Sequence, residues 1–254
     1  LPDRNGLELM ADFFALDSEV RVIVITANGS IIKAIEAMRG GAFEFLVKPF
    51  DENRLINTVE NAAAASGQQR LPPVIDVAKG SEFHGFIGTS PKMREVYRKI
   101  TAISRSMATV FISGESGTGK EICAQAIHAT STRARGPFVP LNCGAIPPDL
   151  LESEVFGHLK GSFTGAIADS VGAAGAADGG TLFLDEICEM DLNLQTKLLR
   201  FLQTSTVQPV GAIKARKVNV RIICATNRDP YEEVKSGRFR EDLFYRLNVV
   251  PVEI

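Results

Sequence analysis

One eight-residue stretch limits the possible folds more than any other feature of the chain. Residues 114–121 read GESGTGKE and follow the apolar run TVFIS at 109–113, which predicts a strand. A helical pattern continues over 119–131. Glycines at this spacing let backbone N–H groups turn inward around an anion, and the positive end of the following helix points at the same place. The stretch therefore predicts a phosphate-binding loop inside an α/β domain.

The loop supplies a positive charge but lacks one customary metal ligand. Lys120 would face the β and γ phosphates of a nucleotide. Glu121 stands where this loop type carries Ser or Thr for Mg²⁺, so a water molecule or Thr118 would have to substitute. A glycine-rich turn without a ligand is the alternative. The expected ATP-binding residues are Gly114, Glu115, Ser116, Gly117, Thr118, Gly119, Lys120, Glu121 and Asn227.

A second motif makes the ligand-free alternative hard to sustain. The apolar strand pattern at 181–185 ends in two carboxylates, Asp185 and Glu186. Asp185 can hold Mg²⁺ through water, and Glu186 can act as general base toward the attacking water. An acidic cap at a strand end is the alternative. The pairing of this motif with the loop predicts nucleotide hydrolysis.

Two asparagines also follow predicted strands. Asn227 comes after the strand at 218–226 and is placed to contact a γ-phosphate. Asn142 ends the strand at 137–142 and could restrain Glu186. For both residues, capping of their own loops is the alternative, because Asn side chains often hydrogen-bond nearby backbone.

Three arginines cluster in the stretch GRFREDLFYRL at 237–247. Arg238, Arg240 and Arg246 could reach a phosphate as a finger. Surface ion pairs with Glu241 and Asp242 are the alternative.

The N-terminal third has its own α/β pattern. Strands are expected at 20–26, where a run of β-branched residues indicates a buried strand, and at 43–47. Helices are expected at 30–39 and from Asp51 to about 65. This β-α-β-α order predicts a parallel sheet, but two strands are too few for an independent domain. Residues 67–85 form a linker stiffened by Pro72 and Pro73, either an extended tether or one with a docked strand at 74–77.

Composition excludes several classes of protein. The formal net charge of −2 gives no basic nucleic-acid surface, and no apolar run reaches the roughly 18 residues that a membrane span needs. The start of the chain has no signal-peptide pattern. The cysteines show no CxxC pair and are expected to be reduced core thiols of a cytoplasmic protein: Cys123, Cys143, Cys188 and Cys224.

With these motifs in view, residues 86–254 resemble the AAA+ domain of bacterial enhancer-binding proteins, which activate sigma-54 RNA polymerase. The stretch GSFTGA resembles the family's GAFTGA loop, with Ser in place of the first Ala, and is expected to be a mobile, glycine-flanked tip with one exposed aromatic. The resemblance implies a hexameric or heptameric ring, with Arg240 and Arg246 as fingers acting on a neighbouring subunit. The expected sigma-factor loop is Gly161, Ser162, Phe163, Thr164, Gly165 and Ala166.

Residues 1–66 resemble the C-terminal half of a response-regulator receiver. Thr26, Phe45 and Lys48 match the family's switch threonine, aromatic and lysine, and the bond to Pro49 is often cis in that family. The resemblance implies an upstream phosphotransfer protein or kinase, with the acceptor aspartate upstream of Leu1. The helical lid and an enhancer-DNA-binding domain would follow Ile254. Residues 188–204 and 85–97 are similar to a quorum-sensing branch of the family.

The expected fold class is α/β: a partial receiver with a doubly wound parallel sheet at 1–66, the linker at 67–85, and an AAA+ P-loop three-layer α/β/α domain at 86–254, truncated at both ends. The expected function is ATP- and Mg²⁺-dependent activation of sigma-54 RNA polymerase. Another AAA+ remodelling ATPase is one alternative, which the loop and the receiver half disfavour. A phosphorylation-gated binding module with weak ATPase is the other, and the intact Lys120, Asp185 and Glu186 disfavour it.

Overall fold

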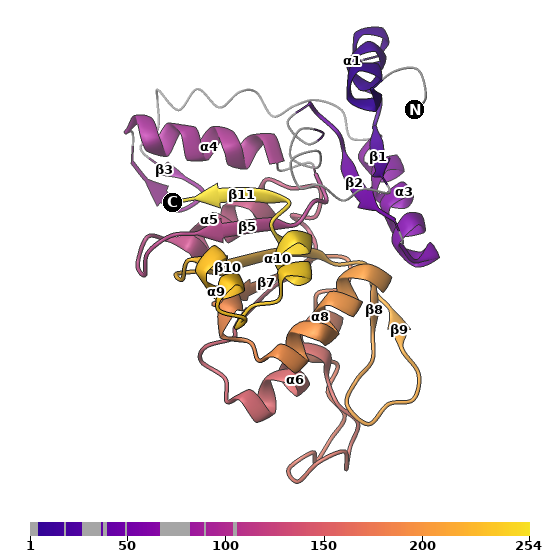
Figure 1. The fold of residues 1–254 in the computed structure, drawn as a ribbon, viewed down its shortest axis with the longest axis vertical. Helices are drawn as coiled ribbons and strands as arrows, with labels where there is room; N and C mark the ends of the chain where they lie inside the picture. The colour runs from indigo at the N-terminus through magenta and orange to yellow at the C-terminus, as the bar shows by residue number, and fades with distance from the viewer. Residues whose placement is uncertain are drawn as a thin grey trace.

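The computed structural model describes residues 5–17, 19–26, 37, 40–48, 50–66, 82–88, 90–103 and 106–254. They form two α/β parts (Figure 1). We call residues 5–66 the N-terminal part and residues 82–254 the C-terminal part.

A five-stranded sheet organises the C-terminal part. Its strands are β5 (Val110–Ser113), β6 (Phe138–Asn142), β7 (Thr181–Asp185), β10 (Arg221–Thr226) and β11 (Val250–Glu253), in the order β11-β5-β10-β7-β6. Every neighbouring pair is parallel. Helices therefore have to cover both faces, and the strands are apolar on both sides, with all of β10 buried.

The helices form two layers around this sheet. One face packs against α4 (Pro91–Ile103) and α5 (Lys120–Ala129), where Ile112 and Phe183 point. The other packs against α6 (Pro148–Phe156), α7 (Gly172–Ala176), α8 (Leu192–Thr204) and α10 (Glu241–Leu247), where Phe111 and Leu184 point. Shorter pieces are the 3₁₀ turn η1 (Ile187–Glu189) and α9 (Pro230–Lys235). The three-layer α/β/α prediction is confirmed.

The N-terminal part is much smaller. Strands β1 (Ile23–Thr26) and β2 (Glu44–Val47) pair in parallel, flanked by α1 (Gly6–Leu16) and α3 (Glu52–Ser66). Its own core comprises Met10, Ala37, Ala42 and Phe45. The prediction of a buried strand over 20–26 is wrong in two respects: β1 begins at Ile23, and Ile25 is 44% exposed, because the pair covers only one of its faces.

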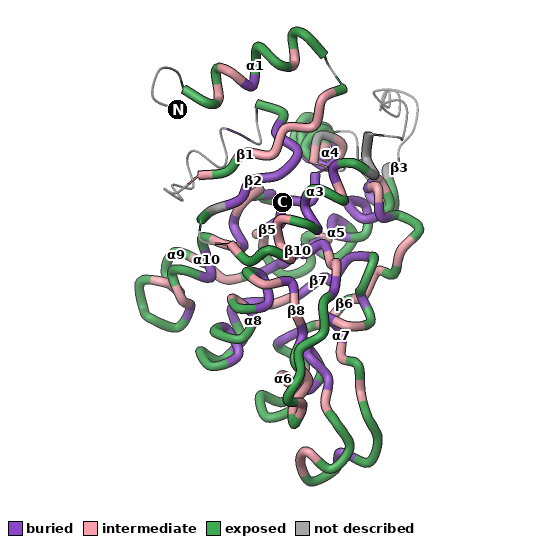
Figure 2. The backbone as a smooth tube through the Cα atoms, turned by 90° about the vertical axis from the view of Figure 1, so that its right-hand side faces the viewer, coloured by how far each residue is buried: buried purple, intermediate pink, exposed green. Residues whose placement is uncertain are grey.

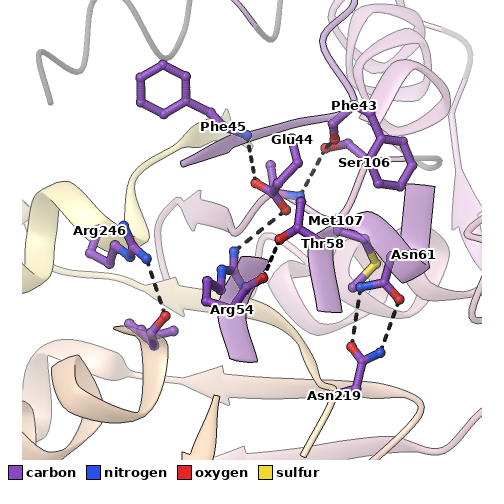
Figure 3. Close-up of polar contacts among 12 residues, drawn as sticks. Phe43, Glu44, Phe45, Arg54, Thr58, Asn61, Ser106, Met107, Asn219 and Arg246 are labelled. Atoms are coloured by element: carbon purple, nitrogen blue, oxygen red, sulfur yellow. Dashed lines mark hydrogen bonds and ion pairs between the residues drawn. The ribbon is translucent and has the colours of Figure 1, made fainter. Parts of the chain in front are cut away.

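The N-terminal part rests on the C-terminal part through α3 and the start of β2 (Figure 3). Asn61 and Asn219 exchange two side-chain hydrogen bonds of 3.3 and 3.1 Å. The Arg133 guanidinium donates to the Asn61 carbonyl oxygen at 3.0 Å, and Asn57 donates to the backbone of Val218 at 3.3 Å. These contacts join segments far apart in the sequence.

Apolar and charged groups complete this interface. Met107 of the C-terminal part is buried with Phe43 and Ala62 of the N-terminal part. The Ser106 hydroxyl donates to the Phe43 carbonyl oxygen at 3.0 Å (Figure 3). Glu44 is 2% exposed and forms an ion pair of 3.6 Å with Arg54, so a carboxylate is buried at the boundary of the two parts.

Several short elements were not anticipated from the sequence. These are α1, α6, α7, α9, α10 and the two-stranded hairpins β3 (Glu82–Phe83) with β4 (Phe86–Ile87) and β8 (Thr206–Val207) with β9 (Arg216–Lys217). The strand expected at 218–226 begins at Arg221. The expected helix at 30–39, apart from Ala37, and the segment 74–77 lie outside the described residues.

All four cysteines are buried and free, as expected of reduced core thiols. Burial raises the pKa of Cys123 and Cys143 to about 12 and of Cys188 to about 11, and raises that of Cys224 as well. Neutral, inaccessible thiols are poor nucleophiles and metal ligands. Among the described residues, no helix combines the length and the apolar character that crossing a membrane requires.

Candidate nucleotide site

The predicted site residues meet at one edge of the sheet. Because all five strands are parallel, their carboxyl ends lie together, and this edge is where α/β sheets bind ligands. The loop at 114–121 follows β5, Glu186 follows β7 and Asn227 follows β10. A cavity of about 1180 Å³ opens here, lined in part by Gly114, Thr118 and Asn227.

The loop has the backbone that its glycines predict. Gly117 and Gly119 have φ values of 84° and 90°, which only glycine adopts without strain. A side chain at Gly114 would come within 2.4 Å of the Ile254 carbonyl oxygen. Lys120 is 7% exposed, and its ammonium donates to the carbonyl oxygens of Gly114 and Glu115, both at 3.0 Å. The loop thus curls around a positive charge at the start of α5.

The two candidates near the metal position behave differently. Thr118 is exposed, and its hydroxyl donates to the Glu115 carbonyl oxygen of the same loop at 2.9 Å. Glu121 accepts a hydrogen bond of 3.3 Å from Gln125, one turn along α5. Glu121 therefore lies along its helix, and the replacement of the missing hydroxyl by Thr118 or water stays a prediction.

Asp185 and Glu186 form the carboxylate end of β7. The Asp185 carboxylate accepts the Glu186 backbone N–H at 2.9 Å. Glu186 has φ 50° and ψ 48°, a left-handed conformation that is uncommon outside glycine. Its carboxylate accepts the Asn227 backbone N–H at 3.3 Å. The structure therefore brings Glu186 to Asn227, and the bend aims the carboxylate along the strand edge.

Asn142 takes the alternative role. Its side-chain oxygen accepts the backbone N–H groups of Gly144 at 2.9 Å and Ala145 at 3.1 Å, which caps the turn after β6. The expectation that Asn142 restrains Glu186 is not met in this structure. Both residues flank Gly144, where an added side chain would lie 3.5 Å from Asn142 and 3.6 Å from Glu186.

Two of the three arginines are ion-paired within the chain. Arg240 pairs with Asp242 through two hydrogen bonds of 3.0 and 2.7 Å, and this pairing raises the pKa of Arg240. Arg238 pairs with Glu233 through two bonds of 2.8 Å, and lowers the pKa of that carboxyl. The ion-pair alternative therefore holds here for Arg240 with Asp242, although Arg240 keeps an exposed position at the start of α10.

Arg246 lies on the opposite end of α10, near the boundary of the two parts. Its guanidinium donates to the Leu202 carbonyl oxygen at 3.4 Å (Figure 3). The pKa of Arg246 is lowered to about 10, mainly by burial and then by the positive charge of Arg54, while Glu44 acts in the opposite direction. The N-terminal part thus contributes to the electrostatic environment of this arginine.

The GSFTGA segment forms a closed tip remote from the sheet. Gly161 N–H donates to the Ala166 carbonyl oxygen at 2.8 Å, and Ala166 N–H to that of Phe163 at 3.1 Å. Gly161 and Gly165 have φ values of 79° and 105°, as their predicted role requires. Figure 2 shows mainly exposed backbone at this end of the molecule. The expectation of an exposed aromatic is wrong, however, because Phe163 is half-buried while Thr164 is exposed.

The three expected receiver residues lie on or next to the two parallel strands. Thr26 ends β1 opposite Val47, and the Lys48 N–H donates to the Thr26 carbonyl oxygen at 2.8 Å, so both follow parallel strand ends. Lys48 is exposed. Phe45 is 7% exposed and belongs to the small core. Pro49 lies outside the described residues.

Gln195 is a positioning residue that the sequence analysis missed. It is fully buried in α8; its amide donates to the carbonyl oxygens of Met190 at 2.8 Å and Arg238 at 2.9 Å. Its side-chain oxygen accepts the Arg240 N–H at 2.8 Å. Gln195 thereby fixes the start of α10, and a lone polar residue on the apolar face of an amphipathic helix was the available signal.

Comparison with known proteins agrees with this geometry. Residues 86–253 match the family described as Sigma-54 interaction domain, and residues 1–60 match the Response regulator receiver domain. The chain is 56% identical over all 254 residues to the regulatory protein LuxO of Vibrio vulnificus, and 46% identical to the response regulator protein PilR of Pseudomonas aeruginosa. It spans 56% of the length of each of these relatives.

A solved structure covers the same extent. NtrX from Brucella abortus, in complex with ATP, is 38% identical with a TM-score of 0.62, covering 98% of this chain and 55% of that one. The expected likeness to one branch of the family is met by LuxO, at 56% identity over the whole chain. Since the matched domain takes up more than half of the chain and contains the whole nucleotide edge, the chain belongs to the family of sigma-54 interaction domain proteins.

Proposed function

We propose that this chain is the receiver and ATPase portion of an ATP-dependent, cytoplasmic transcriptional activator of sigma-54 RNA polymerase in a two-component, quorum-sensing phosphorelay. One observation carries the proposal. The nucleotide edge and the GSFTGA tip occur in one domain, joined through β6, α6 and β7. The C-terminal part would therefore hydrolyse nucleotide at the sheet edge and bind a partner protein through the GSFTGA tip. The LuxO and PilR relatives, and the ATP in the NtrX structure, support it.

The loop after β5 would bind the triphosphate. Backbone N–H groups of residues 114–120 and the N-terminus of α5 provide the anion site, and the ammonium of Lys120 can exchange its two carbonyl partners for phosphate oxygens. The cavity of about 1180 Å³ adjoins this loop at Gly114, Glu115 and Thr118, and Arg21 and Phe43 of the N-terminal part also line it. Gly117 is exposed, and a side chain added there would meet no atom within 4 Å, so a phosphate group could approach its backbone closely.

The carboxylates after β7 would carry the hydrolytic step. A Mg²⁺ ion, when bound, neutralises charge on the phosphates. Asp185 would hold it through water, while Glu186 removes a proton from the attacking water. The Asn227 N–H that holds the Glu186 carboxylate keeps that carboxylate at the strand edge, and the Asn227 side chain would contact the γ-phosphate.

The fingers would come from a neighbouring subunit of a hexameric or heptameric ring. Arg240 lies at the start of α10, where its bidentate pair with Asp242 holds the guanidinium plane at the surface. Arg246 lies one helix length away. A guanidinium delivered in trans stabilises charge in the transition state.

The remaining partners follow from the two matched domains. A complete receiver would take a phosphoryl group from an upstream kinase or phosphotransfer protein, with Thr26 and Lys48 at the switch, and a C-terminal domain would bind enhancer DNA. We propose the boundaries 1–66, 67–85 and 86–254 for receiver half, linker and ATPase domain. Loop residues 161–166 would contact the sigma factor through Phe163 and Thr164.

The test pairs two measurements on one set of variants. Phe163→Ala and Thr164→Ala proteins should keep a substantial part of their ATP turnover while losing capture of sigma-54 in the presence of an ADP–metal-fluoride mimic. Phe13→Ala, which removes an exposed aromatic from α1, is the matched control. If both loop variants capture the factor and open promoters as the unmodified protein does, residues 161–166 are not the loop that contacts the sigma factor. Loss of nucleotide binding in both would place the tip in the catalytic site instead.

A further inference from the structure

Phe163 does not project freely from its loop. Its ring lies against the imidazole of His158, with ring centroids 5.0 Å apart and planes at 69°. This edge-to-face geometry is a favourable aromatic arrangement. The half-buried state of Phe163 therefore has a specific partner, three residues before the first glycine of the tip.

His158 belongs to the rigid stem of the loop. Its backbone exchanges hydrogen bonds of 3.0 and 2.8 Å with Ser170 on the returning strand, and it also bridges to Val210 in the β8–β9 connection. Its Nδ1 lies 2.6 Å from the Ser153 hydroxyl of α6. The backbone of His158 is thus held by Ser170 and Val210, and its imidazole is held by Ser153.

The tip can pivot on its glycines. An added side chain at Gly161 or Gly165 would meet no atom within 4 Å, so both glycines lie in open space. Within the tip, Ser162 packs near Gly211 of the β8–β9 connection, where an added side chain would come within 2.8 Å of Ser162. The Ser162 hydroxyl is buried there without a hydrogen-bond partner among the described residues. Burial without a partner disfavours this position, so the aromatic contact is the attraction that opposes it.

We propose that His158 is a positioning residue that holds Phe163 down on the stem of the loop, so that presentation of Phe163 to the sigma factor requires the Phe163–His158 contact to open. The inference rests on the proposed function only for the identity of the partner. A single aromatic contact is weak, so it shifts the balance between held and free tips by roughly 2- to 10-fold. Such a balance suits a tip that must be released in each cycle.

The contact can be measured without any partner. The chain contains no tryptophan, so Phe163→Trp places a single indole fluorophore at the tip. Acrylamide quenching of this fluorophore in the nucleotide-free protein should increase by roughly twofold when His158 is replaced by Ala, because the ring loses its cover. His158→Phe keeps an aromatic partner and should restore low quenching, whereas His158→Gln keeps a polar partner for Ser153 and should not. His84→Ala, at an exposed histidine of the β3–β4 turn, is the control.

A second readout links the contact to presentation. In a protein with native Phe163, His158→Ala should raise nucleotide-independent capture of sigma-54 by roughly 2- to 10-fold, because the competent state becomes more populated. Unchanged quenching in His158→Ala and His158→Gln would overturn the contact. Increased quenching with unchanged capture would overturn its role in presentation. If Phe163→Ala itself captures the factor normally, Phe163 is not the proposed sigma contact, and the quenching result still decides whether His158 holds the tip.

Discussion

The two parts of this chain are built from the same α/β pattern but differ in how each one is stabilised. The C-terminal part has five parallel strands covered on both faces, with two large apolar clusters. The described N-terminal part has a half-buried strand β1, a buried strand β2 and a core of four buried residues, and its second cluster includes Met107 from the other part. A two-stranded sheet buries too little to stand alone. The described smaller part therefore shares one of its two buried clusters with the larger part.

The two candidate finger arginines, Arg240 and Arg246, also differ in which part of the chain they interact with. Arg240 pairs within the C-terminal part, whereas Arg246 is influenced by Arg54 and Glu44 of the N-terminal part. Each Arg→Ala variant should lower ATP turnover by about 10³-fold or more while ATP binding is kept. Mixing either variant with Lys120→Ala protein should restore some turnover at shared interfaces. Steady-state ATP hydrolysis at a series of mixing ratios measures the recovery of turnover. Nucleotide binding by each variant alone shows whether ATP affinity is kept.

Only Arg246→Ala should also alter the N-terminal part. Hydrogen exchange in α3 should decrease in that variant, because the repulsion between Arg246 and Arg54 is larger than the attraction between Arg246 and Glu44, and it should stay unchanged in Arg240→Ala. Absence of recovery at every mixing ratio would contradict fingers acting in trans, and equal exchange in the two variants would contradict the asymmetry between them.

The catalytic carboxylate should be independent of the smaller part. Glu186→Gln should lower ATP turnover by about 10²- to 10⁴-fold, because the water loses its base, while nucleotide affinity stays near that of the unmodified protein. Lys120→Ala should instead weaken binding. Titration with a fluorescent ATP analogue and single-turnover hydrolysis separate the two effects. Normal hydrolysis by Glu186→Gln would refute its assignment as base.

The amide pair tests the dependence of one part on the other. Asn61→Ala or Asn219→Ala removes the two reciprocal hydrogen bonds and a side-chain hydrogen bond from Arg133, and should cost about 0.5–1.5 kcal/mol per bond. Hydrogen exchange should show loss of protection in α1, β1 and α3 with the central sheet unchanged. The double variant should show non-additivity, since the residues are partners. Additive effects, or equal loss in both parts, would mean that the contact does not hold the smaller part in place.

The smallest effect concerns pH and belongs to the larger part. His128 is buried on α5, and its Nδ1 lies 2.9 Å from the Thr181 hydroxyl. Burial, and then the positive charge of Arg221, lower the pKa of His128 below its usual value of 6.5. The unfolded chain then binds a proton that the folded chain does not, so the free energy of unfolding should fall as pH drops below about 6.5.

The slope from this one histidine cannot exceed about 1.4 kcal/mol per pH unit. Urea unfolding at pH 7.5 and 5.5 should show a smaller difference in His128→Gln than in the unmodified protein. His84→Ala serves as control, because His84 is exposed. The same pH dependence in His128→Gln would assign it to other groups.

Local patterns in the sequence predict the nucleotide edge well. The GESGTGKE stretch and the TLFLDE strand end are complete within a few residues, so their chemistry and their place on parallel strand ends follow directly. The role of Asn142 does not, because its amide oxygen can cap Gly144 while its amide nitrogen could donate to Glu186, and only geometry decides which of these bonds forms. The burial of Phe163 depends on the turn that brings it back to His158.

Contacts between distant segments could not be predicted from local patterns. Nothing near Asn61 or Asn219 marks them as partners, since their surroundings are ordinary helix and loop. Helix α10 was missed because seven residues are too few for clear periodicity, although Arg240 and Arg246 on it were found by motif. The short β8–β9 hairpin lacks apolar alternation, so its packing against the loop stem had no sequence signal.

The left-handed backbone of Glu186 has a practical consequence for anyone who engineers this protein. A non-glycine residue in that conformation costs about 1–3 kcal/mol, and glycine would relieve it. A library screened for heat resistance alone would therefore favour Glu186→Gly, which removes the proposed base. Directed evolution for stability should therefore include an ATP-hydrolysis assay in every round, because a stabilising change at Glu186 would also remove the proposed base.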